Sequence, residues 1–72
     1  MTILKQIRQD RGMRLRELGL QARLSQGDLS KVERRVMLAY PSWQSSIAEA
    51  TGVDEAVLFD PDGFARELEG CY

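Results

Sequence analysis

Residues 11–35 of the chain read RGMRLRELGLQARLSQGDLSKVERR, and this stretch decides the fold. Its apolar residues recur at helical spacing in two groups, at positions 15, 18 and 22 and again at positions 29 and 32. Each group forms one apolar stripe along a helix and leaves charged residues on the opposite side. The stretch therefore predicts two consecutive amphipathic helices.

The boundary between these two helices is short and well marked. Ser25 is a good N-cap, with Asp28 three residues later as in a capping box, so the second helix should begin at Gln26 and run to about residue 35. Only Arg23 and Leu24 remain to connect it to the first helix. Helices joined so closely cross at a large angle, which is the helix-turn-helix arrangement.

Three further helices are predicted around this pair. Residues 3–11 form an amphipathic segment that stops at Gly12, residues 41–52 begin with Pro and end with Gly, and residues 54–59 form a short helix capped by Asp54. The predicted core side chains include Val36, Val57 and Leu58. We expect an all-α, compact five-helix domain over residues 1–60.

The tail, residues 61–72, is expected to add one or two further helical turns. It would place Phe64 and Leu68 on one side and serve as a dimerisation segment. On this interpretation, truncation after Phe59 would weaken DNA binding without unfolding the domain.

Composition excludes several classes of chemistry. The 72 residues contain one cysteine and no histidine, so a disulfide framework, a Cys/His zinc site and a Ser-His-Asp triad cannot be built. We expect no enzyme, no cofactor, no metal ion and no small-molecule substrate. Because no signal peptide or membrane-spanning run is visible, we also expect a cytoplasmic protein that has no contact with membranes.

Charge is divided unevenly along the chain. The net charge is only −1, but residues 1–36 hold nine basic and four acidic residues, whereas residues 37–72 hold one basic and seven acidic residues. Such an asymmetry can orient the first half toward a polyanion, although two ordinary solvated faces would give the same count.

The stretch at residues 11–35 resembles the helix-turn-helix of the Xre and Cro/repressor family. Gly19 stands at the fifth position of the motif, where the helices touch, and SKVER matches its Ser-x-x-Glu-Arg ending. The resemblance extends from about Leu4 to Phe59 and implies a lambda-repressor-like fold. It also implies a DNA-binding transcriptional regulator, most simply a repressor. Such a protein binds double-stranded DNA as a homodimer on a palindromic operator. The second helix of the motif then lies in the major groove.

The resemblance also implies the contact residues. Gln26 suits adenine and Lys31 suits guanine, while Asp28 could accept a hydrogen bond from cytosine or serve only as a cap. The full set of expected base contacts is Ser25, Gln26, Gly27, Asp28, Ser30 and Lys31. The expected phosphate contacts, which position the protein without reading sequence, are Arg14, Arg16, Arg34 and Arg35.

Other positions have expected structural roles. The family pairs a glutamate like Glu33 with a basic residue of its first helix, here Arg8, and Trp43 is expected in the core rather than at a phosphate. Arg23 replaces a common turn glycine, which carries a penalty if a positive φ is required. Gly27 disfavours its helix but could allow DNA to approach the main chain.

A second function remains open from the sequence. The domain could be a protein-interaction module, such as an antitoxin or a coactivator-like adaptor. The apolar residues of its acidic half, Met37, Leu38, Phe64 and Leu68, would then meet a protein partner.

Overall fold

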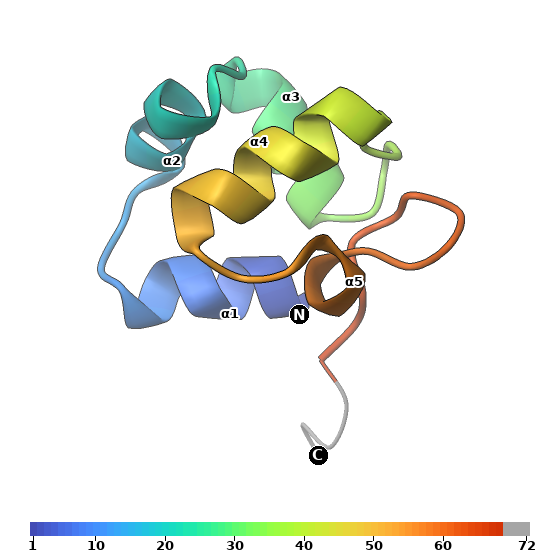
Figure 1. Ribbon diagram of the computed structural model, residues 1–72. Coiled ribbons are helices and arrows are strands. Elements are labelled where there is room, and N and C mark those ends of the chain that lie inside the picture. Colours follow the sequence, from blue (N-terminus) through green and yellow to red (C-terminus); the bar gives the residue numbers. More distant parts are fainter. Residues whose placement is uncertain (69–72) are drawn as a thin grey trace.

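Five helices follow one another in the computed structural model, which describes residues 1–68 (Figure 1). They are α1 (Ile3–Asp10), α2 (Leu15–Ala22), α3 (Gln26–Glu33), α4 (Pro41–Thr51) and α5 (Glu55–Leu58). The all-α prediction is confirmed, and each helix lies where the sequence placed it to within two residues. In the described range, no helix combines the length and the apolar character needed to cross a membrane.

Local capping interactions explain these helix boundaries. The hydroxyl oxygens of Thr2 and Ser25 accept hydrogen bonds from the backbone N–H groups of residues 5 and 28, and the Asp54 carboxylate accepts one from residue 56. Pro41 occupies the first turn of α4, and Gly52 ends that helix with φ of 72°. Each signal acts over three or four residues, which is why the sequence displays it.

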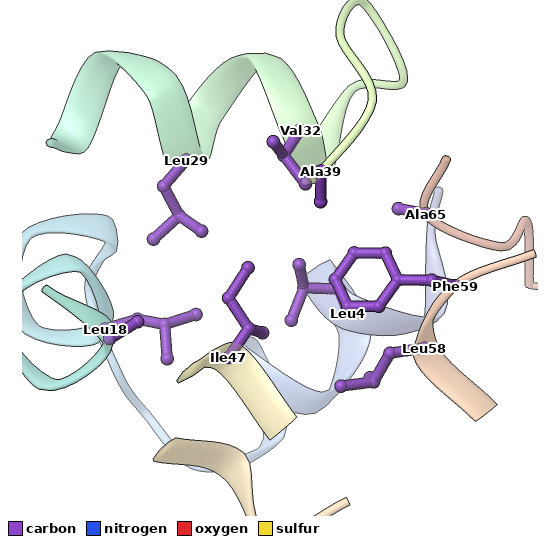
Figure 2. Packing of buried hydrophobic residues seen from close by; sticks show 10 residues of the cluster. Leu4, Leu18, Leu29, Val32, Ala39, Ile47, Leu58, Phe59 and Ala65 are labelled. Carbon is purple, nitrogen blue, oxygen red and sulfur yellow. The ribbon is translucent and has the colours of Figure 1, made fainter. Parts of the chain in front are cut away.

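The core is formed where all five helices meet (Figure 2). Leu4, Leu18 and Ile47 bring α1, α2 and α4 together, and Trp43 packs against this cluster as predicted. The complete set of buried apolar residues is Leu4, Leu18, Ala22, Leu29, Val32, Ala39, Ile47, Leu58, Phe59 and Ala65.

Two predicted core residues lie at the surface instead. Val36 is 65% exposed because α3 ends at Glu33 and Arg35 adopts a left-handed conformation with φ of 60°, so Val36 no longer continues the buried stripe. Val57 is 48% exposed, and Phe59 is buried after α5 in its place.

The prediction of helical turns in the tail is wrong for the described residues 61–68. Instead of a helix, residues 61–68 form a turn and an extended segment, and residues 69–72 of the predicted tail lie outside the described residues. The Asp60 carboxylate accepts hydrogen bonds from the backbone of residues 62 and 64, which reverses the chain. The extended segment then forms antiparallel bridges at Phe59–Ala65 and Thr2–Glu67.

This segment is part of the folded domain. Ala65 is completely buried, the Ile3 N–H donates to the Arg66 carbonyl at 2.9 Å, and the Arg66 N–H donates to the Leu58 carbonyl at 2.8 Å. Residues 65–68 thus connect the start of α1 to the end of α5 (Figure 1).

We therefore expect truncation after Phe59 to destabilise the domain, in contrast to the expectation from sequence. It removes Ala65 from the core and several backbone hydrogen bonds, each worth ~1 kcal/mol, so the free energy of unfolding should fall by about 3 kcal/mol or more. Urea unfolding followed by circular dichroism measures this. Truncation after Leu68 is the control, and an unchanged midpoint in the shorter chain would contradict the expectation.

Arg23 holds a backbone conformation that suits glycine better. Its φ is 60° at the C-terminal end of α2, in the left-handed region that L-residues enter at a cost of roughly 1 kcal/mol. We expect Arg23→Gly to raise the free energy of unfolding by about 0.5–1 kcal/mol. Gln21→Gly, an exposed position inside the same helix, should lower it by a similar amount, and a loss in both variants would show that Arg23 is not strained.

Candidate nucleic-acid interface

The junction of α2 and α3 is tight because Gly19 has no side chain. The Leu24 N–H donates to the Gly19 carbonyl at 2.8 Å, and a Cβ on Gly19 would lie 2.8 Å from the Leu24 carbonyl oxygen. Any larger residue would push the connection away from α2. The small residue expected where the two helices touch is therefore present and buried.

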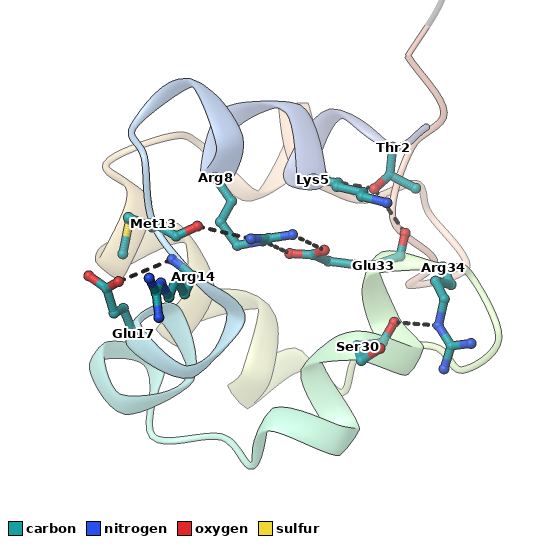
Figure 3. Close-up of polar contacts among 9 residues, drawn as sticks. All are labelled: Thr2, Lys5, Arg8, Met13, Arg14, Glu17, Ser30, Glu33 and Arg34. Carbon is teal, nitrogen blue, oxygen red and sulfur yellow. Dashed lines mark hydrogen bonds and ion pairs between the residues drawn. The ribbon is translucent and has the colours of Figure 1, made fainter.

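The other end of α3 is attached to α1 by a buried ion pair (Figure 3). Arg8 Nε and Nη2 donate to the two carboxylate oxygens of Glu33 at 2.7 and 3.2 Å, and Arg8 Nη1 donates to the Met13 carbonyl at 2.9 Å. The side chains are 12% and 3% exposed. The two residues expected to pair are thus brought together, and their contact joins α1, α3 and the loop before α2.

Thr2 adds a contact that the sequence analysis did not foresee. Its hydroxyl donates to the Glu33 backbone carbonyl at 2.9 Å while its oxygen caps α1. The capping role is visible in the sequence, because Thr2 precedes the first apolar residue of a helix. The contact with Glu33 is not, because it spans 31 positions.

With both ends fixed, α3 presents one side to solvent. We call its six predicted base-contact residues the α3 outer face. Ser25, Gln26, Gly27 and Lys31 are exposed, and Asp28 and Ser30 are partly exposed. The Ser25 hydroxyl accepts the Asp28 N–H at 3.1 Å, so the cap uses the backbone of Asp28 and leaves its carboxylate open to solvent.

Three of the four predicted phosphate-contact residues are exposed cations without acidic partners in the described part of the chain. Arg14 and Arg16 lie at the start of α2, and Arg34 follows α3. The Arg34 Nε donates to the Ser30 carbonyl at 3.3 Å, which holds this side chain along the end of α3. These three side chains, together with Lys31, leave the α2–α3 pair with unpaired positive charge.

Arg35 is placed differently. Its guanidinium lies 3.5 Å from an Asp60 carboxylate oxygen and 3.7 Å from one of Glu67, and it stacks over the Phe64 ring at 5.8 Å. All three partners belong to the segment after α5. Arg35 is therefore directed toward this acidic segment, and its charge is largely matched within the chain.

Other surface features are chemically plain. No group of three or more acidic, cysteine or histidine residues that could hold a metal occurs within residues 1–68. An open polar groove of about 540 Å³ lies between α2 and α4, lined by Gln21, Arg23, Ser46 and Glu49 among others. None of the predicted contact residues lines this groove.

The Arg8–Glu33 pair should be essential for stability. We expect Arg8→Met or Glu33→Leu alone to lower the free energy of unfolding by about 3 kcal/mol, because each leaves a buried charge without its partner. The double variant Arg8→Met/Glu33→Leu should recover much of this loss, since neither charge remains. Urea unfolding of all four proteins measures the coupling, and losses that simply add would contradict a direct buried interaction.

Comparisons of the chain with protein-family models, with curated proteins and with solved structures gave no match. The family resemblance of residues 11–35 is therefore carried by the sequence motif alone. What the structure establishes is a small, compact, all-helical domain, with five helices in the described part of the chain.

Proposed function

We propose that this chain is a sequence-specific DNA-binding protein of the Xre and Cro/repressor kind. In this proposal α2 and α3 form the helix-turn-helix, and α3 enters the major groove of double-stranded DNA. A transcriptional repressor that occludes a promoter is the simplest regulator of this type.

The observation that carries the proposal is the way in which α3 is held. Its C-terminal end is fixed to α1 through Glu33, and its N-terminal end is fixed to α2 through the Gly19–Leu24 contact. The residues of the α3 outer face nevertheless remain exposed or partly exposed to solvent. An eight-residue helix is only marginally stable alone, so its rigid placement with one open side suits a helix that is inserted into a partner.

Gln26 and Lys31 are the principal base readers in this proposal. Both are exposed, and the Gln26 side chain makes no hydrogen bond within the described residues. Its amide can donate to adenine N7 and accept from adenine N6, and the Lys31 ammonium can donate to guanine O6 and N7. The open carboxylate of Asp28 can accept from cytosine N4.

Arg14, Arg16 and Arg34 supply the phosphate contacts. They flank the α2–α3 pair at its two ends, which suits the positions of phosphates on either side of a groove. The family often has a glutamine at the motif position of Leu15, and that glutamine binds a phosphate. Leu15 packs against the core instead, so in this proposal Arg14 or Arg16 makes the phosphate contact. Arg35 is left out, because its charge is engaged by Asp60 and Glu67.

The test is selection of bound sequences from a random DNA pool, followed by affinity measurements at several salt concentrations. We expect an enriched inverted repeat with half-sites about one helical turn apart, bound by a homodimer. The absence of any enriched sequence, with only weak and strongly salt-dependent binding, would contradict the proposal.

Two substitutions separate base reading from phosphate binding. Gln26→Ala should weaken binding to the selected site by ~1–3 kcal/mol and relax specificity at one base pair. Arg16→Ala should weaken binding to all sequences alike and reduce the slope of log K against log salt by about 1. Electrophoretic mobility or fluorescence anisotropy titrations measure both, and equal behaviour of the two variants would contradict the assigned roles.

A second candidate function is supported by the loop between α3 and α4. Val36 is 65% exposed and Tyr40 54%, and neither is needed to cover the core. An interaction module would use such residues to meet a protein partner. Met37 supports it less, since that side chain packs against the core. Co-purification of a stable hetero-complex, combined with failure of the DNA selection, would favour this function.

A further inference from the structure

The glycines in the described part of the chain fall into two groups. Most of them are required by the fold. Gly12, Gly52 and Gly63 have φ between 66° and 94°, where other residues are strained, and Gly19 lies against the Leu24 carbonyl.

Gly27 alone forms the second group, because neither a positive φ nor a close contact applies to it. It lies in the first turn of α3, as the second residue of that helix, it is exposed, and a Cβ built on it would meet nothing within 4 Å. Glycine also disfavours a helix relative to alanine, so Gly27 weakens α3 without relieving any contact inside the domain. The fold supplies no reason for a missing side chain at this position.

We propose that Gly27 is the point of closest approach between the main chain of α3 and the edge of a base pair. This inference rests on the proposed function and adds to it. Residues three and four positions along a helix share its face, so Gly27 lies next to Ser30 and Lys31 and opposite the buried Leu29 and Val32. Gly27 is therefore part of the α3 outer face, which points toward the groove floor.

Dimensions explain why one methyl group matters. A helix with its side chains is roughly 10–12 Å across, and the major groove is about 12 Å wide, so little space remains between them. Without a Cβ at Gly27, α3 can lie deeper in the groove, where Gln26 and Lys31 reach base edges. A base edge is favoured over a phosphate because the immediate neighbours Gln26 and Asp28 carry no positive charge. The exposed cation on the same face, Lys31, is one of the proposed base readers, and the unpaired arginines lie at the ends of the pair.

The test compares the wild-type chain with Gly27→Ala and Gly27→Val on DNA selected from the random pool. We expect Gly27→Ala to bind the wild-type site at least about tenfold more weakly, and Gly27→Val more weakly still, as one base-pair mismatch would. A repeated selection with Gly27→Ala should change the preferred base pair at one position of each half-site. The melting temperature of Gly27→Ala should equal or exceed that of the wild type.

The matched control for Gly27→Ala is an alanine substitution on the exposed surface of α2. Gln21→Ala changes an exposed, uncharged residue at the α2–α4 groove and should leave DNA affinity unchanged. Unchanged affinity in Gly27→Ala would overturn the inference, as would a loss that is equal for all sequences, since that result would indicate approach to a phosphate. If the wild-type chain itself selects no sequence, the proposed function fails. This failure can be distinguished from failure of the Gly27 inference, because it is seen before any variant is compared.

Discussion

The placement of α3 depends on one buried carboxylate. Both oxygens of Glu33 accept hydrogen bonds from Arg8, and its backbone carbonyl accepts one from Thr2, so the last turn of α3 is bound to α1 by side chain and main chain together. A buried ion pair gains little over a well-packed apolar contact, but it tolerates only one geometry. Its main contribution here is to set the position of α3, because an eight-residue helix cannot maintain an orientation alone.

The parts of this fold that were predicted from sequence are those that depend on neighbouring residues. Ser25, Asp54, Pro41 and Gly52 act on the helix that begins or ends beside them, and the helix bounds agree with the structure. The extended segment after α5 could not be predicted in this way. Phe64 and Leu68 are spaced four residues apart, as in a helix, but the hydrogen bonds that decide the conformation of this segment come from residues 1–3 and 58–60.

The candidate interface shows the same limit for charge. The family resemblance supplied the residues of the α3 outer face, and their exposure or partial exposure agrees with the helical stripe, which buries the opposite side of α3. The resemblance was not sufficient to separate Arg34 from Arg35, although the two are adjacent. Arg34 remains along the end of α3, whereas the left-handed backbone of Arg35 turns its side chain toward Asp60 and Glu67. A count of basic residues therefore overestimates the charge that is available to a polyanion.

The small size of the α3 outer face bears on how the proposed function could be specific. One copy presents about three side chains able to read bases, Gln26, Asp28 and Lys31, and a good base contact discriminates by ~1–3 kcal/mol. Specific DNA binding commonly exceeds non-specific binding by ~4–10 kcal/mol, whereas three such contacts supply about 3–9 kcal/mol, so one copy reaches the upper part of this range only if every contact is near its best. A second copy on a symmetric site doubles the number of readers without adding a residue to the chain. The proposed close insertion of α3 at Gly27 would have the complementary effect, because it would make each of these few contacts more sensitive to the base pair beneath it.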